Sequence, residues 1–564
     1  MNRLVLLVAL VAAVALALAV RLVPQAGDTR ARGGVYSRLD DSESAYRLRL
    51  VELALATEHA PSRDRFLEPD GPADIPWPPL LHAGVAVIAA HALGAAESAP
   101  EIAGIDETRL ERFALGIGPA LGLLATLAAA MFAFSTAPKE RRLVPVVVAA
   151  LLWALLPVSI ARESAGTLHS HGLVAFLGLI QFASLAIALR AAERIDVTVG
   201  ALACGIAAGL GQLAGPESWP ISVSVAGTLA ALAARKPKPQ ARDAWRVVLL
   251  YLAAALAVMS IPEADDASAR WLPDFERGLD GLLHTSFDTL VLTSALAVLA
   301  GVSAWPARRD PLRAALVGVL FLSLACALFD RRFFAPLAVA GVALLTLALQ
   351  LESAVLQRRA RVLALVLLVA CGAAVLFRAA VHEEPEPSLA SGLRWLRDRS
   401  SSPGAFNHPD AEQSWRVAAP PELFGSGALP ARRPVRAASY DGGSTGDLAH
   451  LRELFASPDA ASLARALALS DCPYLVVTPL CAFDHQLGLT PDSFVARLAL
   501  DEPGELAGEL ERVFASAERI TISGGRPGEA GKPAEPAGPA LSIYRRLSGA
   551  VERRVGPTLS PAGR

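Results

Sequence analysis

The sequence predicts a polytopic α-helical membrane protein that ends in a soluble domain of mixed α/β structure. The 564 residues are 53% hydrophobic with a mean hydropathy of +0.42, and near-continuous apolar runs recur until about residue 380. A formal net charge of −2, with no basic stripe of interleaved aromatic residues, argues against nucleic acid as a partner. Alanine, arginine and leucine abound, as in GC-rich bacterial genomes, so the expected location is a bacterial inner membrane.

The first apolar run follows Arg3 and reads LVLLVALVAAVALALAV. It is either a signal peptide or a first transmembrane helix. Its flank, RLVPQAG, offers no clean small-x-small cleavage site, which favours a retained helix. Residues 24–111 then form a large first external loop. Within this loop, residues 80–97 are marginal in length and carry two histidines, which favours a helix that does not span the membrane.

The positive-inside rule distinguishes two topologies. If residues 80–97 do not span the membrane, the loops APKERR, RAAERID, ARKPKPQARDAWR, PARRDPLR and QRRAR all face the cytoplasm. If they do span it, all these basic loops face outward. The sequence therefore predicts about eleven spanning helices, a cytoplasmic N-terminus and an extracytoplasmic C-terminus. After the first helix, the predicted spans are approximately 112–135, 143–160, 172–191, 197–214, 218–234, 246–262, 288–305, 313–329, 333–351 and 361–378.

The predicted domains are a multi-pass membrane domain, residues 1–379, and a soluble periplasmic domain, residues 380–564. In the second domain, LASGLRWLRD predicts a helix and PYLVVTP a buried strand. Residues 522–540 are rich in Gly and Pro and predict a flexible insertion. Cys472 and Cys481 lie nine positions apart. They either form a disulfide or remain two free thiols, and the sequence favours neither.

This topology brings four polar clusters to the outer face of the membrane. Their members are Asp40, Asp41 and Glu43; His169 and His171; Glu263, Asp265 and Asp266; and Arg331 and Arg332. Converging carboxylates and imidazoles can hold a divalent metal, because oxygens suit Mg or Mn and imidazole favours Mn or Zn. A pair of arginines suits phosphate or pyrophosphate. The plainer interpretation is that the acids are simply solvated and the arginines reach lipid headgroups.

The segment LPVSIARESAGTLHSHG resembles a motif of the oligosaccharyltransferase catalytic-subunit family. In that motif a proline, an arginine and a small-residue pair with glycine precede an acid-x-acid pair. The matching positions are Pro157, Arg162, Ala165, Gly166 and Gly172. Similar elements occur in the family's order from about residue 1 to 445, among them SESAYRLRLVE, FLEPDGPADIPWPPLLHAG and SIPEADDASARW. The family belongs to the C-type (GT-C) membrane glycosyltransferases.

The resemblance implies a GT-C fold and transfer of a glycan from a polyprenyl-linked pyrophosphate to a protein or glycan acceptor at the bilayer. It implies that Glu43, with Asp40 and Asp41 beside it, is the first-loop metal carboxylate. It also implies that Glu263 holds the metal and contacts the acceptor. Glu43 and Glu263 are therefore the expected catalytic residues, and Mn or Mg is the expected cofactor.

The resemblance also implies roles for three arginines. Arg331 or Arg332 would neutralise the leaving pyrophosphate, because a guanidinium stabilises the charge that develops on it. Arg162 would support the metal ligands of the following turn. In that turn, His169 and His171 are the expected metal ligands in place of the family's two acids, since neutral imidazole also binds metals.

Two departures from the family pattern leave the function open. The acid-x-acid pair is replaced by His169, Ser170 and His171, and the Trp-Trp-Asp acceptor motif is missing, with only Trp415 in its place. One hypothesis is a divergent glycosyltransferase. The alternative is a non-catalytic GT-C-fold scaffold or lipid-carrier binding protein. A transporter is a third class, although no inverted repeat is evident.

Overall fold

The computed structural model of the chain divides into two compact units. The first comprises Met1–Thr29, Pro76–Ala92 and Arg112–Glu383, and the second comprises Arg30–Ile75, Leu93–Glu111 and Glu384–Arg564. The structure describes residues 3–31, 42–57, 61, 63–64, 73–75, 78–93, 107–191, 193–235, 237–260, 293, 295–298, 301–302, 310–401 except 381–388, 414–420, 423, 431, 433, 437–440, 443–446, 448–479, 481, 487, 489, 493–501, 506, 508–517, 519–521 and 536–547.

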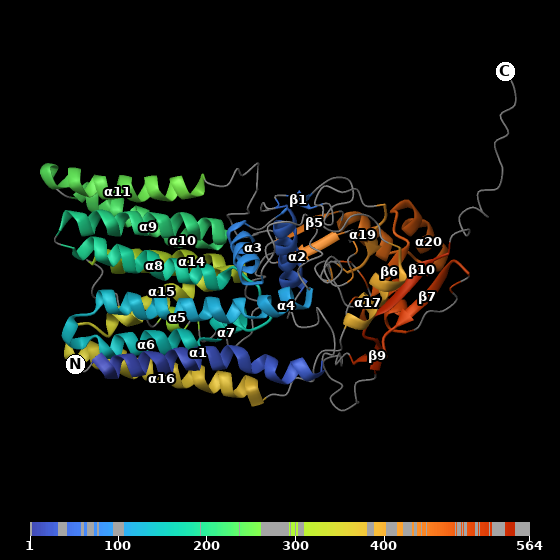
Figure 1. Ribbon diagram of the computed structural model, residues 1–564, viewed down its shortest axis with the longest axis horizontal. Helices are drawn as coiled ribbons and strands as arrows, with labels where there is room; N and C mark the ends of the chain where they lie inside the picture. Colours follow the sequence, from blue (N-terminus) through green and yellow to red (C-terminus); the bar gives the residue numbers. More distant parts are fainter. Residues whose placement is uncertain are drawn as a thin grey trace, which may run out of the picture. The chain divides into compact units, whose positions relative to one another are not determined.

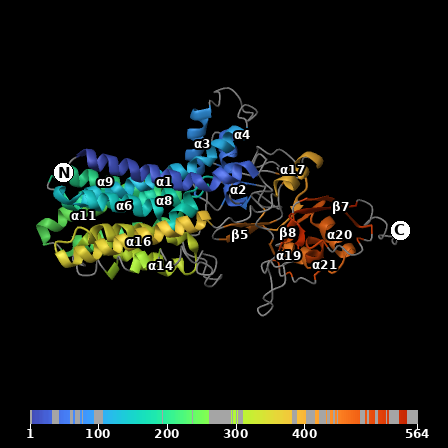
Figure 2. The same cartoon turned by 90° about the horizontal axis from the view of Figure 1, so that it is seen from below.

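The first unit is a bundle of long apolar helices (Figures 1 and 2). Proline stands in the first turn of several of them, where its missing N–H has no helical partner to lose. The helices of this unit are α1 (Arg3–Ala31), α3 (Leu80–Leu93), α5 (Ile117–Thr136), α6 (Leu143–Leu155), α7 (Pro157–Glu163), α8 (His171–Arg190), α9 (Arg194–Ala214), α10 (Trp219–Arg235), α11 (Lys238–Met259), α14 (Pro311–Ala327), α15 (Phe334–Ala348) and α16 (Ala354–Ala380), with 3₁₀ turns η2 (Lys139–Arg141), η3 (Pro216–Ser218) and η6 (Arg331–Phe333). Helix α4 (Glu107–Leu115) joins residues of the two units.

Helix α15 lies inside the bundle and packs against α14, α8, α6 and α5 (Figure 1). Each of its fifteen residues is buried, and it contributes a large share of the main apolar core. By contrast, α16 and α1 expose rows of large apolar side chains such as Leu7, Val11, Val362 and Val369. An exposed apolar surface of this kind fits lipid rather than water.

The prediction of a multi-pass helical membrane protein is confirmed, but the count of eleven spans is not. Within the described residues, five helices are long and apolar enough to cross a membrane. A sixth span is added if α6 and α7, bent by 57° at their junction, are taken as one. Ten of the eleven predicted spans coincide with helices, and the run 288–305 lies largely outside the described residues. The predicted non-spanning segment 80–97 contains the short helix α3.

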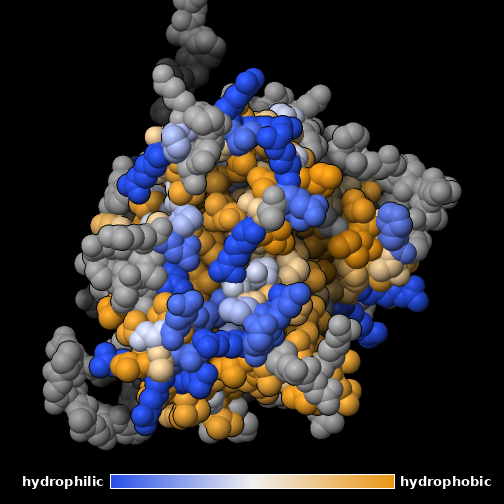
Figure 3. All heavy atoms as spheres, turned by 90° about the vertical axis from the view of Figure 1, so that its left-hand side faces the viewer, coloured by the Kyte–Doolittle hydropathy of each residue, from blue (hydrophilic) through white to orange (hydrophobic). Residues whose placement is uncertain are grey.

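Hydrophilic side chains gather at one end of the bundle, with hydrophobic side chains among and around them (Figure 3). Lys139, Glu140 and Arg141 of η2 are exposed there. Two side-chain hydrogen bonds link the helix ends. Arg190 donates to the carbonyl of Thr136. The hydroxyl of Thr136 accepts from Gln350 at 3.0 Å. The turns at this end are among the loops predicted to face the cytoplasm, and the pocket described below lies at the other end of α8.

The second unit contains helices and a small mixed sheet. Its elements are α2 (Ser42–Thr57), β1 (Arg63–Asp64), β2 (Ala73–Asp74), α17 (Ala390–Arg399), β3 (Val417–Ala418), β4 (Ala437–Tyr440), β5 (Gly443–Gly446), α19 (Leu448–Phe455), α20 (Ala460–Leu469), β6 (Tyr474–Val477), α21 (Phe494–Ala499), β7 (Leu510–Ala515), β8 (Arg519–Thr521), β9 (Pro536–Pro539) and β10 (Ser542–Arg546). The four-stranded sheet has the order β3-β6-β10-β7. Strand β6 is parallel to β3, and the other pairs are antiparallel.

Several sequence predictions fall in this second unit. The predicted helix is α17, and the predicted buried strand is β6, whose four residues are all buried. Residues 522–535 of the predicted flexible insertion lie outside the described residues, but 536–539 form β9, paired with β8. Cys472 and Cys481 are both buried, and no disulfide joins them. The structure thus favours two thiols over a disulfide.

Helix α2 is anchored within the second unit by a buried polar triad. Asp64 of β1 accepts hydrogen bonds from the Tyr46 hydroxyl at 2.6 Å and from Arg49 at 2.8 and 2.9 Å. All three residues are 0% exposed. Burial, followed by the charge of Asp64, raises the pKa of Tyr46, so this hydroxyl stays protonated and continues to donate.

Candidate functional site

The polar turn between α7 and α8 forms the centre of the site. Pro157 cannot continue the α6 hydrogen-bond ladder, so the chain bends by 57° and starts the short helix α7. After Glu163, residues 164–170 leave the helical conformation and α8 begins at His171. Gly166 has φ of 99°, a left-handed conformation that favours glycine. This glycine is one of the positions that match the oligosaccharyltransferase motif.

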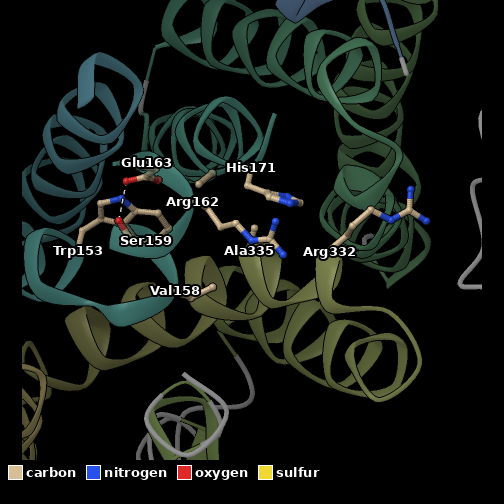
Figure 4. Close-up of a pocket in the computed structure, with 9 residues that line it drawn as sticks. Trp153, Val158, Ser159, Arg162, Glu163, His171, Arg332 and Ala335 are labelled. Atoms are coloured by element: carbon tan, nitrogen blue, oxygen red, sulfur yellow. Dashed lines mark hydrogen bonds between the residues drawn. The ribbon is translucent and has the colours of Figure 1, made fainter. Parts of the chain in front are cut away.

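A pocket opens beside this turn (Figure 4). Its lining residues are Trp153, Val158, Ser159, Arg162, Glu163, His171, Ala175, Arg332 and Ala335. They come from α6, α7, α8, η6 and α15. Ser159 and Glu163 lie at one side of the view and Arg332 at the other, with Arg162 and His171 between them. Three side chains that carry or can carry positive charge thus line one small pocket.

Glu217 fixes the orientation of His171. The His171 ring contacts the Glu217 carboxylate at 3.0 Å from Nδ1 to Oε1, and Ser170 donates to the same oxygen at 3.3 Å. Burial raises the pKa of Glu217, but the hydrogen bond and charge of His171, together with the charge of Arg332, lower it below its ordinary value. Glu217 is therefore a carboxylate that can only accept, so Nδ1 of His171 donates to it.

We expect replacement of Glu217 by glutamine to destabilise the protein at neutral pH. A carboxylate with a lowered folded pKa contributes stability above its unfolded pKa, and this contribution is lost as the pH falls through the folded pKa. The difference in thermal midpoint between wild type and Glu217→Gln should therefore shrink below about pH 4. Glu140→Gln, at an exposed acid of η2, is the control. A pH-independent difference would contradict this expectation.

Asp330 holds Arg332 at the edge of the pocket. Its carboxylate accepts from Arg332 Nε at 2.9 Å and from Nη2 at 2.6 Å. Its other oxygen accepts from the Arg332 backbone N–H at 3.0 Å, an Asx turn that starts η6. Phe333, the next residue, packs edge-on against Trp219 with ring centroids 6.3 Å apart. This ring contact keeps η6 next to the turn that carries Glu217.

The structure brings some predicted site residues together and leaves others undecided. Arg162, His171 and Arg332 line the pocket, and the His169 ring stacks on that of His171 with centroids 5.8 Å apart. Asp40, Asp41 and Glu263 lie outside the described residues. Glu43 is on α2 in the second unit and Arg331 is on η6, but neither side chain is described.

The described residues do not by themselves fit a metal centre. Among them, no group of three or more His, Cys, Asp and Glu side chains is arranged to hold an ion. His171 and Glu217 contact each other, but a zinc site takes at least three protein ligands. The predicted Mn or Mg therefore depends on carboxylates outside this part of the chain.

Sequence reasoning missed several polar residues of this site, among them Glu163, Arg21 and Glu217. Glu163 lies within the matched motif, and Arg21 flanks the first apolar run. Glu217 is the only charged residue between Arg194-Ile-Asp196 and Arg235, a stretch otherwise fit for two spans. An isolated acid in such a stretch is by default a candidate functional residue. This signal could have identified Glu217.

The fold matches solved oligosaccharyltransferases over nearly the whole chain. One is archaeal oligosaccharyltransferase AglB from Archaeoglobus fulgidus, in complex with an inhibitory peptide and a dolichol-phosphate. Its TM-score is 0.69 at 13% sequence identity, covering 96% of this chain and 88% of that chain. The Archaeoglobus fulgidus enzyme tethered to an acceptor peptide containing the NVT sequon has a TM-score of 0.67 at 14% identity, with coverages of 97% and 89%.

A further structure of the Archaeoglobus fulgidus oligosaccharyltransferase, in complex with Zn and sulfate, has a TM-score of 0.67 at 14% identity. The match covers 95% of this chain and 88% of that chain. No protein-family model matches the sequence, and no curated protein does. At such low identity the likeness concerns the fold. The chain therefore has an oligosaccharyltransferase-like fold, as the sequence resemblance implied.

Proposed function

We propose that the chain is a membrane glycosyltransferase that moves a glycan from a polyprenyl pyrophosphate to an acceptor on the outer face of a bacterial inner membrane. The observation that carries this proposal is the clustering of Arg162, His171 and Arg332 in one pocket of an oligosaccharyltransferase-like fold. The likeness spans 96% of the chain. The Archaeoglobus fulgidus relatives were solved with a dolichol-phosphate and with an acceptor peptide, which supports a lipid-linked donor.

The pocket suits the departure of a pyrophosphate. As the bond from the sugar to the pyrophosphate oxygen breaks, negative charge grows on that oxygen, and the acceptor nucleophile bonds to the sugar carbon and gives its proton to water. Guanidinium groups already fixed in place stabilise this charge without rearranging during the step. Arg332 is fixed by Asp330, and His171 is fixed by Glu217. Arg162 donates further hydrogen bonds to the phosphate oxygens, and so does His171 when its Nε2 carries a proton.

A divalent metal enters this proposal only through residues that the structure does not describe. One relative was solved with Zn and sulfate. For Mn or Mg to bind here, Asp40, Asp41, Glu43 or Glu263 would have to join His169 and His171. The donors among the described residues do not form a metal group by themselves.

The decisive experiment separates recognition of pyrophosphate from recognition of the lipid. The purified protein in lipid nanodiscs is titrated with polyprenyl pyrophosphate and, separately, with polyprenol of the same chain length. We expect clearly tighter binding of the pyrophosphate, and a loss of this preference in His171→Ala. Equal affinities for the two lipids would contradict the proposal.

The second candidate is a non-catalytic protein that binds a lipid carrier. It is favoured by one observation, the replacement of both motif acids by His169 and His171. Turnover distinguishes it from the enzyme: a lipid-linked saccharide is incubated with the protein and a mixture of peptide and glycan acceptors. Transfer or release of the saccharide supports the enzyme, whereas binding of pyrophosphate without turnover supports the carrier-binding protein.

A further inference from the structure

We propose that Arg21 of the first helix is a positioning residue for the pocket. Its ion pair with Glu163 holds the turn that carries Arg162 and His171. The inference deepens the proposed function and rests on it for the identity of the ligand. The geometry of the pair itself stands on the described residues alone.

Arg21 is completely enclosed and makes hydrogen bonds with all of its nitrogens. It is 0% exposed, and Glu163 is 2% exposed. Nη2 and Nε donate to Glu163 Oε2 at 2.6 and 3.2 Å. Nη2 also donates to the hydroxyl of Ser159, which in turn donates to Glu163 Oε2 at 2.6 Å. A buried charge pair with this many additional hydrogen bonds is strongly specified in geometry.

The same guanidinium contacts backbone carbonyls at the break between α6 and α7. The carbonyl of Trp153 would accept from the N–H four residues later, but that residue is Pro157, which has no N–H. Arg21 Nη2 lies 3.5 Å from this carbonyl, and Nη1 donates to the carbonyl of Ala154 at 3.3 Å. A cation at a helix C-terminus is also favoured by the helix dipole. Arg21 thus binds both sides of the 57° bend.

Backbone and packing contacts extend this link to the turn itself. The N–H of Ala165 donates to the carbonyl of Arg21 at 3.0 Å. A Cβ added to Gly122 of α5 would lie 2.1 Å from Arg21 Nε and 2.7 Å from Glu163 Oε2. Gly122, which has no side chain, therefore leaves the room that the ion pair of Arg21 and Glu163 occupies.

Glu163 connects Arg21 to the residues that line the pocket. It directly follows Arg162, and it packs against the first turn of α8. A Cβ on Gly172 would lie 3.1 Å from Glu163 Cγ and 3.3 Å from Oε1. Gly172 is the neighbour of His171. A shift of Glu163 would therefore move both Arg162 and His171, which face the same pocket.

The test measures order in the turn and ligand binding in the same full-length protein. Arg21→Met is compared with Arg142→Met, since Arg142 also binds a helix-terminal carbonyl, that of Ala137 at 3.1 Å. In Arg21→Met we expect faster amide hydrogen exchange in residues 161–172 and unchanged exchange in residues 137–142. We also expect the preference for polyprenyl pyrophosphate over polyprenol to fall, by on the order of 10²-fold, as for other misplaced site groups. Arg142→Met should leave this preference intact.

Two further variants separate positioning from stability alone. Arg21→Lys keeps the charge but cannot make the forked contacts. Compared with Arg21→Met, it should therefore bring the thermal midpoint closer to the wild-type value than it brings the preference for polyprenyl pyrophosphate. Arg21→Met combined with Glu163→Leu removes both buried charges. It should recover the midpoint while the preference stays low.

The outcomes distinguish this inference from the proposed function. Unchanged exchange in residues 161–172 of Arg21→Met, or full recovery of the preference in the double variant, would overturn the positioning role. If the wild type shows no preference for pyrophosphate, the proposed function fails, and the exchange data still decide whether Arg21 orders the turn.

Discussion

In the proposed reaction, replacing Arg332 by glutamine is expected to lower the rate of glycan transfer by about 10²–10³-fold, the usual cost of losing one fixed donor to a developing anion. Glutamine keeps much of the side-chain length but loses the charge. Because Asp330 holds Arg332 through contacts of 2.6 and 2.9 Å, the arginine is fixed before the reaction starts. Its removal therefore takes away stabilisation that is strongest when the pyrophosphate leaves.

The measurement is single-turnover transfer of a lipid-linked saccharide in nanodiscs. Arg194→Gln is the matched control, because the Arg194 side chain of α9 is 87% exposed and lies at the opposite end of the bundle. Asp330→Asn should shift the rate in the same direction as Arg332→Gln, by loosening the same guanidinium. A rate in Arg332→Gln within twofold of wild type would remove Arg332 from the reaction (about 0.4 kcal/mol by the usual conversion).

Substitution of Gly118 by alanine is expected to disturb the pocket from the other side of the turn. A Cβ at this position of α5 would lie 2.3 Å from the backbone oxygen of Ser164 and 2.9 Å from that of Thr167. Neither oxygen can move without moving the turn itself. We expect a loss of about 1–3 kcal/mol in stability from this overpacking, together with weaker binding of polyprenyl pyrophosphate.

Gly227→Ala gives a sharp comparison for this change. Gly227 lies in α10, and a Cβ there would meet nothing within 4 Å. Alanine is better than glycine in a helix by about 1 kcal/mol, so Gly227→Ala should raise the thermal midpoint or leave it unchanged. Similar thermal midpoints for Gly118→Ala and Gly227→Ala would show that the turn between α7 and α8 does not pack tightly against α5 at Gly118.

The helices could be predicted from the sequence, but the number that cross the membrane could not be confirmed. Hydropathy located α14 and α15 within a few residues. Yet α15 has only fifteen residues, about 22 Å at 1.5 Å per residue, against a hydrocarbon core of about 30 Å. Since it is buried on every side, its length is set by neighbouring helices rather than by the bilayer. Apolar length alone therefore does not decide whether such a helix spans.

The site was only partly predictable, because its pairs join residues far apart in the sequence. The resemblance pointed to Arg162, His171 and Arg332, which the structure places in one pocket. It gave no indication that Glu217, 46 residues away, would pair with His171. Neither did it link Glu163 to Arg21. Periodicity reports which side of a helix is apolar, but it does not report which turn of another helix lies opposite.

The contact between Arg21 and Glu163 also constrains the order of assembly in the membrane. The two residues are separated by 142 positions, so α1 is synthesised long before its partner exists. Until then the arginine, near the end of an apolar helix, can extend its guanidinium to the polar interface. It becomes enclosed only when α5, α6 and α7 have been made and packed against α1. Closure of this pair is therefore a late, long-range event, and cutting α1 away as a signal peptide would remove the cation that pairs with the buried Glu163.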